Sequence, residues 1–346
     1  MRRPAIGITM GDAAGIGPEI ILKALSDTTV YEHCRPCVIG DARILERAET
    51  IVRTGGRVRR IRDLSQASFE AGIVDCLDLD LLTNDLPFGR VCAAAGEAAF
   101  QYLKCAVELA RTRQIDAIVT APVNKEALHA AGHRYPGQTE ILATLTGTTN
   151  YALMMAAPTL KVILVTLHVG LADALRLIEP GRVYAVIELA HATLRRAGCT
   201  EPRIAVCGVN PHAGEKGLFG HREEEEKIIP AIERARRSGI RVSGPWPADS
   251  VFARAHRGEF DVVVAMYHDQ GLAPIKTVAW EEAVNITVGL PIVRTSVGHG
   301  TAYDIAGRGT ASARNLQAAL RYAIEMSRGE DGHSGCTRRR DDADAG

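Results

Sequence analysis

The chain has 346 residues, of which 41 are lysine or arginine and 41 are aspartate or glutamate. This length allows two domains and a sizeable core. A formal net charge of zero argues against a nucleic-acid partner, because general nucleic-acid-binding proteins carry a basic excess; the absence of a long apolar stretch argues against a membrane partner.

Strand-like apolar runs alternate with amphipathic helical stretches, a pattern typical of an α/β fold with a largely parallel sheet. The first strand, residues 4–10, leads through a glycine-bearing loop into a helix that begins near Gly17, with Pro18 in its first turn. In chain order, the pattern then predicts strands at 37–39, 51–61 and 115–120 and helices at 94–111, 180–197, 222–238 and 311–327.

The N-terminus and the cysteines indicate the cellular compartment in which the protein works. Residues 1–10 superficially resemble a charged leader, but Gly11 and Asp12 interrupt them before an apolar signal-peptide core could form. There are eight cysteines, most of them in apolar contexts. Cys34 and Cys37 have CxxC spacing without a second pair to complete a zinc site. We therefore expect free thiols and a cytoplasmic protein.

His168, His212 and His268 each lie just past the end of a short, continuous, β-branched run. Such runs are typical of buried parallel strands, whose carboxyl ends form the ligand crevice of an open α/β sheet. Three imidazoles at one sheet edge predict a divalent-metal site with open coordination positions. Zinc is favoured, with cobalt, manganese, nickel or magnesium as alternatives.

Other polar residues could contribute to a site at the same edge of the sheet. Asp249 and Asp269 could orient the histidines or contact a substrate, although Asp269 could equally cap a strand end. The run at 223–226 is typical of a solvated first helical turn. Further polar side chains are expected in loops after strands or turns, namely Asn124, Lys125, Gln138, Thr139, Lys276, Asn285 and Arg294. The cations among them would suit an anionic substrate.

Two glycine-rich turns complete the set of candidate sites. The loop with Gly11, Gly15 and Gly17 follows a strand and precedes a helix, as a phosphate-binding turn does, but it matches neither GxGxxG nor a Walker A motif. The second turn spans residues 298–307, where glycine lets backbone amides approach a ligand closely.

Longer sequence motifs give the chain a specific resemblance to a known protein family. From about residue 4 to 327 the chain resembles the 4-hydroxythreonine-4-phosphate dehydrogenase family and, more distantly, the isocitrate and isopropylmalate dehydrogenases. The strings that carry it lie at 11–12, 15–20, 124–125, 135–140, 168–169, 210–215, 244–249, 267–271 and 289–296.

The resemblance implies an α/β fold of two α/β/α lobes with a central cleft, assembled as a homodimer. The first lobe would comprise residues 1–135 and 300–327, and the second, residues 136–299, would hold the metal site and the dimer interface. Residues 328–346 are polar and charged, and we expect them to be a disordered tail.

It also implies an NAD- and metal-dependent enzyme that oxidises a secondary hydroxyl and decarboxylates the resulting β-keto acid. The three histidines would hold the ion, with at least one supplied across the dimer interface. Proton transfer would fall to Lys276, Asp249 or Asp269. A small anionic substrate would contact Gln138, Thr139, Lys276, Asn285 and Arg294, and NAD would contact Asn285, Gly289, Pro291, Ser296, His299 and Gly300.

Two departures from the family pattern concern the substrate. Gln138 stands where members that use 4-phosphooxy-L-threonine usually have histidine, and Gly298 stands where they usually have aspartate. 4-Phosphooxy-L-threonine or a related four-carbon sugar-acid phosphate is the favoured substrate. The alternative is the cis-dihydrodiol of terephthalate, which has no phosphate to pair with the missing cation.

Considered without the family resemblance, the residues also allow two functions of other classes. Three strand-end histidines also allow a metal-dependent hydrolase or lyase without a nicotinamide cofactor. A non-catalytic sensor of a phosphorylated ligand is a third hypothesis, which retention of all three histidines and Lys276 disfavours.

Overall fold

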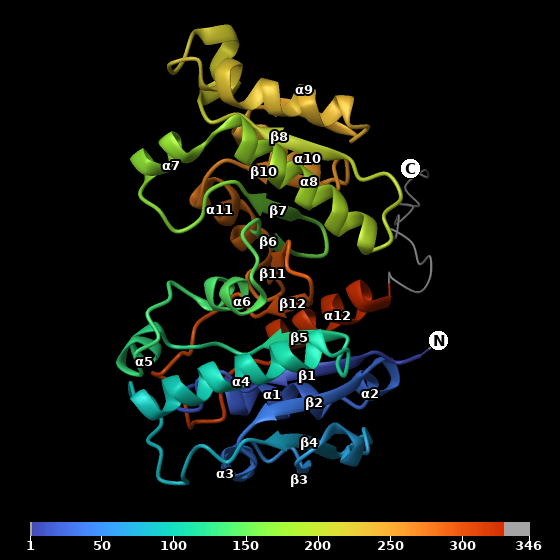
Figure 1. Ribbon diagram of the computed structural model, residues 1–346, viewed down its shortest axis with the longest axis vertical. Helices are drawn as coiled ribbons and strands as arrows, with labels where there is room; N and C mark the ends of the chain where they lie inside the picture. Colours follow the sequence, from blue (N-terminus) through green and yellow to red (C-terminus); the bar gives the residue numbers. More distant parts are fainter. Residues whose placement is uncertain (1, 329–346) are drawn as a thin grey trace, which may run out of the picture.

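The computed structural model describes residues 2–328 and is drawn in Figure 1. Within these residues the strands form one twelve-stranded sheet, in the order β3-β4-β2-β1-β5-β12-β11-β6-β7-β10-β8-β9. The strands are β1 (Ala5–Thr9), β2 (Arg35–Gly40), β3 (Arg57–Ile61), β4 (Ile73–Asp78), β5 (Ala117–Thr120), β6 (Ala152–Ala156), β7 (Lys161–Leu164), β8 (Ile204–Cys207), β9 (Val242–Trp246), β10 (Val262–Ala265), β11 (Val284–Val288) and β12 (Val293–Ser296).

Helices cover the sheet along its length, and several begin where the sequence predicts. Pro18 lies in the first turn of α1, and the long alanine-rich helix is α4. The helices are α1 (Gly17–Leu25), α2 (Thr29–His33), α3 (Ala42–Val52), α4 (Ala93–Arg111), α5 (Lys125–Ala130), α6 (Gln138–Thr146), α7 (Leu171–Leu177), α8 (Pro180–Arg196), α9 (Ile229–Arg237), α10 (Ala248–His256), α11 (His268–Ala279) and α12 (Arg314–Arg328).

The sheet is largely parallel, as predicted, with an antiparallel segment at its middle. There, β11 pairs in antiparallel fashion with β12 and β6, and β6 pairs in the same way with β7. On one side β1 is parallel to β2 and β5. On the other side β10 is parallel to β7 and β8.

Strand β10 shows why the apolar runs are continuous. Val262 and Val264 pack in one core cluster, which includes Val186 of α8, whereas Val263 packs in a second cluster with Val251 of α10. A strand covered on both faces has no solvent-facing positions and therefore does not alternate.

The strand predicted at 51–61 differs from the structure. Ile51 and Val52 do not belong to a strand, because they end α3, and β3 begins only at Arg57. Arg53 takes a left-handed φ of 52° that terminates the helix. Helix α11 is one of several helices that the sequence pattern does not predict, and it contains Pro274, a residue that normally breaks helices.

The sheet runs without interruption across the predicted lobe boundary, since β12 pairs with both β5 and β11. The division into lobes stays a prediction. Helix α12 includes Arg328, and the rest of the predicted disordered tail lies outside the described residues. No helix among residues 2–328 is both long and apolar enough to cross a membrane.

Candidate functional site

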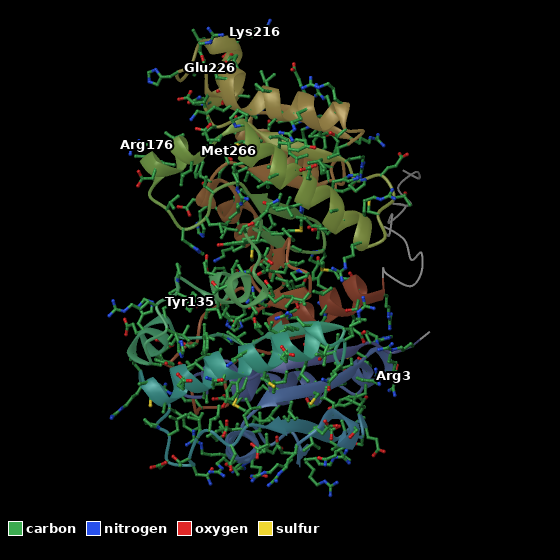
Figure 2. The ribbon with its side chains drawn as sticks, in the orientation of Figure 1. Arg3, Tyr135, Arg176, Lys216, Glu226 and Met266 are labelled. Carbon is green, nitrogen blue, oxygen red and sulfur yellow. The ribbon has the colours of Figure 1, made fainter. Side chains whose placement is uncertain are left out.

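The three strands that precede the candidate metal ligands are neighbours in the sheet, in the order β7-β10-β8, and they run parallel. Their carboxyl ends therefore meet at one edge, as the sequence predicts. The segments beyond β7 and β10 are tied together: Thr166 donates from both its backbone N and its Oγ1 to the carbonyl of Met266, at 3.2 and 2.9 Å. Figure 2 shows Met266 inside this half of the molecule.

His168 and His268 lie together at this edge, with ring centroids 5.3 Å apart. Partial desolvation lowers the pKa of His168, and the neighbouring His268 and Lys125 act in the same direction. A lowered pKa favours the neutral imidazole, which is the form that binds metals. The Nδ1 of His268 lies 2.7 Å from Oδ1 of Asp269. This contact orients the ring and leaves Nε2 available to a ligand.

His212 occupies a separate loop. Residues 212–216 all have positive φ, from 42° to 77°, and the His212 ring lies beside Phe219 at a centroid distance of 6.1 Å. Across residues 2–328, no three or more His, Cys, Asp or Glu side chains are grouped closely enough to hold a metal. One chain thus brings two of the three predicted ligands together, and their shared role stays a prediction.

The prediction that residues 223–226 form a solvated turn is wrong for Glu224, whose exposed fraction is 1%. Its Oε1 accepts from the backbone N of Val209 and of Asn210, at 2.8 and 2.7 Å, and its Oε2 accepts from Asn210 Nδ2. Glu224 therefore anchors the loop that carries His212. Glu226 of the same run does project outward, as Figure 2 shows.

We expect Glu224→Gln to loosen this loop, because an amide replaces a charged acceptor, and hydrogen bonds to charged groups contribute about 1.5–3 kcal/mol each. Zn²⁺ affinity, measured by calorimetry, should fall about tenfold or more, since 1.4 kcal/mol is a factor of ten. Glu226→Gln is the matched control, because that side chain is 63% exposed. Equal Zn²⁺ affinities for the two variants would contradict the anchoring role.

Arg294 is the centre of a second polar cluster. It lies on β12 with an exposed fraction of 2%. Its two terminal nitrogens donate to Thr287 Oγ1 at 2.8 Å and Thr120 Oγ1 at 2.7 Å, and Thr139 Oγ1 lies 3.2 Å from Thr287 Oγ1. Burial lowers the pKa of Arg294 to about 9, against the opposing influence of Glu140. The cluster is thus a desolvated cation lined by hydroxyl groups.

Three buried polar atoms of this region have no hydrogen-bond partner: Gln138 Oε1, Asn285 Oδ1 and Arg294 Nε. The Nε2 of Gln138 donates to the carbonyl of Ala121 at 3.1 Å, which fixes the orientation of its amide. Buried polar groups are rarely left unpaired unless they serve a ligand or water. These atoms therefore mark a place for a polar ligand.

The predicted substrate residues lie in regular elements rather than in loops. Gln138 and Thr139 begin α6, Asn285 is in β11, and Lys276 is in α11 with its Nζ 5.5 Å from the Trp280 ring centroid. Among the loop residues predicted with them, Asn124 is the N-cap of α5 and Lys125 its first residue. Asp249 is exposed in the first turn of α10.

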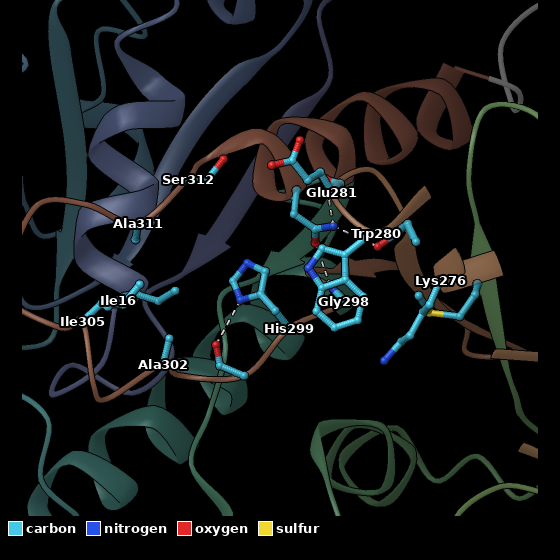
Figure 3. Close-up of a pocket in the computed structure, with 14 residues that line it drawn as sticks. Ile16, Lys276, Trp280, Glu281, Gly298, His299, Ala302, Ile305, Ala311 and Ser312 are labelled. Carbon is cyan, nitrogen blue, oxygen red and sulfur yellow. Dashed lines mark hydrogen bonds between the residues drawn. The ribbon is translucent and has the colours of Figure 1, made fainter. Parts of the chain in front are cut away.

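A pocket of about 320 Å³ lies between α11 and the second glycine-rich turn, as Figure 3 shows. Lys276 lines it on one side, and Gly298, His299 and Gly300 line it on another. The pocket thus joins one predicted substrate residue to predicted cofactor residues. Ser296, also predicted to contact the cofactor, is buried behind the turn and donates to the Thr120 carbonyl.

Gly289 and Pro291 lie elsewhere. They form the turn between β11 and β12, where Gly289 has a φ of 93° and packs against Asn150 and Tyr151. Because Asn285 pairs with Ser296, this turn is at the opposite end of both strands. The structure therefore separates the two residues from the pocket.

Several pocket residues have no recognisable signal in the sequence, namely Met155, Trp280, Ser312 and Asn315. Asn315 fixes the turn: its Oδ1 accepts from Gly298 N at 2.6 Å, and its Nδ2 donates to the carbonyls of Glu281 and Ala283. Only its proximity to the glycine-rich turn in the sequence could have suggested a role.

The fold and these features define an α/β protein with two imidazoles together at one sheet edge, a buried guanidinium on β12 and a glycine-rich turn that lines a pocket. The chain belongs to the family described as "Pyridoxal phosphate biosynthetic protein PdxA", whose family model matches residues 32–323. The resemblance seen in the sequence is thereby confirmed.

Known proteins resemble the chain over nearly its whole length. It is 59% identical over 324 residues to the D-threonate 4-phosphate dehydrogenase of Cupriavidus necator, covering 94% of this chain and 97% of that protein. The crystal structure of a 4-hydroxythreonine-4-phosphate dehydrogenase from Burkholderia phymatum is 57% identical, with a TM-score of 0.85 and coverage of 94% and 99%. A terephthalate 1,2-cis-dihydrodiol dehydrogenase from Burkholderia xenovorans LB400 is 31% identical, with a TM-score of 0.66 and coverage of 94% and 98%.

Proposed function

We propose that this protein is a metal- and NAD-dependent dehydrogenase of a four-carbon sugar-acid 4-phosphate, and specifically of D-threonate 4-phosphate. The hydroxyl carbon beside the α-carbon is oxidised to a ketone, and the resulting β-keto acid loses carbon dioxide. The buried Arg294 carries the proposal, because a desolvated cation with an unpaired Nε suits an anionic ligand. The 59% identical relative supports this substrate.

The substrate's anionic group would bind at Arg294, between Thr139 and Asn285. Gln138 adds a neutral amide there, where usual users of 4-phosphooxy-L-threonine carry histidine. Lys276 lies on the helix that His268 begins. The two residues are eight positions apart, so about two helical turns separate the lysine from the imidazole.

NAD would lie in the pocket beside His299. The apolar side chains of Ile16, Ala302 and Ile305 offer a surface for its adenine, and the backbone at Gly298 and Gly300 allows close approach. When bound, NAD supplies the acceptor for the hydride that leaves the substrate carbon. Lys276 lines the same pocket and would take up the hydroxyl proton.

A divalent ion would be held by His168 and His268 of one subunit and His212 of the other in a homodimer. These three donors fit such an ion, because neutral imidazoles bind zinc and the neighbouring first-row transition metals well. When bound, such an ion supplies electrophilic stabilisation of a developing negative oxygen. Asp269 would keep the His268 ring in its ligating orientation.

Exposed apolar side chains beside the histidines support the dimer. Leu171 and Leu177 of α7 are 60% and 51% exposed, Val169 is 44% exposed, and Leu218 and Phe219 beyond His212 are 70% and 37% exposed. Clustered exposed apolar residues mark interaction sites. A partner seated there would bury them and bring its own His212 loop to the pair.

The proposal is tested by NADH formation with three substrates side by side: D-threonate 4-phosphate, 4-phosphooxy-L-threonine and the terephthalate dihydrodiol. We expect kcat/KM for D-threonate 4-phosphate to exceed the others by about tenfold or more, as the difference of one or two substrate contacts would give. Faster turnover of the dihydrodiol would support the 31% identical relative's chemistry instead and overturn the proposal.

A further inference from the structure

The wall of the pocket opposite Lys276 is held in place from behind by α1. Glu19 accepts from the backbone N of Gly307 at 2.6 Å and of Gly309 at 2.8 Å, using one carboxylate oxygen for each. Four residues further along α1, Lys23 donates from Nζ to the carbonyls of Gly309 and Ala311, both at 2.7 Å. Two side chains thus make four hydrogen bonds to one short turn.

This turn depends on those bonds for its conformation. Gly307 and Gly309 have φ values of 79° and 66°, in the left-handed region that glycine tolerates. A turn of this kind has no helix or strand ladder to satisfy its amides, so they need other acceptors. Glu19 supplies them while fully buried, with an exposed fraction of 0%.

The turn is continuous with the pocket lining. Ile305 precedes it, Ala311 ends it and Ser312 follows it, and all three line the pocket, as Figure 3 shows. The same end of α1 contributes Ile16, whose backbone N donates to the Thr301 carbonyl at 3.1 Å. A shift of the turn would therefore change the shape of the pocket without touching the polar cluster around Arg294.

We infer that Glu19 is a positioning residue for the dinucleotide, acting through the turn at 307–311 rather than by contact. The inference rests on the proposed binding of NAD in this pocket. Its consequence is selective: loss of the carboxylate weakens NAD binding and leaves binding of the anionic substrate group nearly unchanged.

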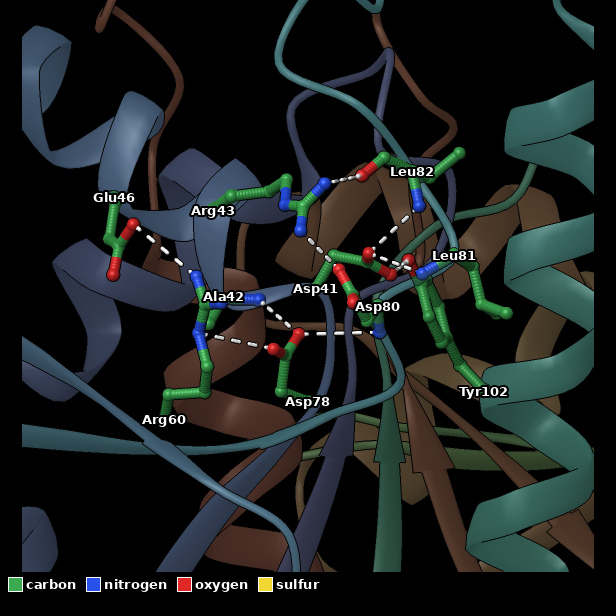
Figure 4. A network of polar contacts seen from close by, with 10 residues as sticks. All are labelled: Asp41, Ala42, Arg43, Glu46, Arg60, Asp78, Asp80, Leu81, Leu82 and Tyr102. Carbon is green, nitrogen blue, oxygen red and sulfur yellow. Dashed lines mark hydrogen bonds and ion pairs between the residues drawn. The ribbon is translucent and has the colours of Figure 1, made fainter.

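Asp41 provides a matched comparison, because it is chemically alike and lies elsewhere. It is also 0% exposed and accepts from two consecutive loop amides, Leu81 N at 2.7 Å and Leu82 N at 2.9 Å, as well as from the Tyr102 hydroxyl. Figure 4 shows this network, none of whose residues lines the pocket. A purely structural role for Glu19 would make the two carboxylates equivalent.

The experiment compares Glu19→Gln with Asp41→Asn by calorimetric titration of NAD and of inorganic phosphate, with Tm recorded for each. We expect Glu19→Gln to weaken NAD binding about tenfold or more, since bonds to a charged acceptor are lost, and to change phosphate binding less than about twofold. Asp41→Asn should lower Tm and leave both affinities within about twofold.

Lys23→Met tests the same turn if Glu19→Gln does not fold, because methionine keeps the apolar stem and removes the donor. It should weaken NAD binding in the same selective way. Unchanged NAD affinity in the folded variants, or parallel losses for NAD and phosphate, would overturn the inference while the proposed function stands. Wild-type protein that fails to bind NAD would overturn the proposed cofactor and the inference with it.

Discussion

A mixed dimer of one His212→Ala subunit and one His268→Ala subunit should recover about half the wild-type rate of NADH formation, although each variant alone should be inactive. The reason is geometric. His168 and His268 lie 5.3 Å apart in one chain, and His212 is held on a different loop. If each site takes two ligands from one subunit and one from the other, the mixed dimer has one intact site of two.

The matched control is a mixed dimer of His168→Ala and His268→Ala subunits. These two histidines come from the same chain in the proposed site, so neither site of that dimer is complete and no rate should return. Both dimers are isolated with two affinity tags, and bound metal is counted by mass spectrometry. Recovery in both dimers, or in neither, would contradict a site shared in this way.

The location of the sheet edge that carries His168 and His268 was predictable because its signal is local. A continuous apolar run ending before a histidine indicates a buried strand whose carboxyl end carries a ligand. That β7, β10 and β8 would be neighbours was not predictable, because β8 follows β7 in the chain and β10 inserts between them. Strand order depends on packing between distant segments, which leaves no local pattern.

The errors at two charged residues share one physical origin, which is tertiary burial. Glu224 sits in a run of four glutamates that looks solvated, yet the amides of the His212 loop need its carboxylate. Arg294 was expected in a loop, where a lone arginine is usually exposed, and is instead buried in β12. In both cases a charged side chain is buried because the surrounding fold, and for Arg294 the proposed ligand, require it.

The motifs shared with the family predicted which distant residues form one site, which local sequence patterns could not do. They assigned Gln138, Asn285 and Arg294 to one substrate site although α6 is far in sequence from β11 and β12, and the structure places unpaired buried atoms on all three residues. The same strings also include Gly289 and Pro291, which the structure places in a turn at the far end of the two strands, with Gly289 packed against residues 150–151.

Replacing Arg294 with methionine should stabilise the ligand-free protein while removing its response to anions. Burial lowers the pKa of Arg294 to about 9, so at neutral pH the folded state holds a charge that the unfolded state solvates better. The free-energy cost of burying this charge is present in full at every pH below the pKa of Arg294 in the folded state. It decreases above that pKa, because the folded state then loses the charge. Methionine removes the cost with a side chain of similar length.

The expected result is a Tm of ligand-free Arg294→Met at least about 2 °C above wild type, since roughly 1 kcal/mol shifts Tm by 2–4 °C in chains approaching this size. Millimolar phosphate should raise the Tm of the wild type and leave that of the variant unchanged. The value of kcat/KM for the sugar-acid phosphate should fall about a hundredfold or more, as expected when one partner of a buried charge pair is lost.

Arg182→Met separates this effect from the general consequence of removing a half-buried arginine. Burial also lowers the pKa of Arg182, but its Nε donates to the Val165 carbonyl at 3.0 Å and a terminal nitrogen donates to the Tyr151 carbonyl at 2.9 Å. Its removal leaves backbone acceptors unpaired and should lower Tm, with the response to phosphate retained. A stabilised Arg182→Met, or an Arg294→Met that still gains stability from phosphate, would show that Arg294 is not a cation held ready for the substrate's anionic group.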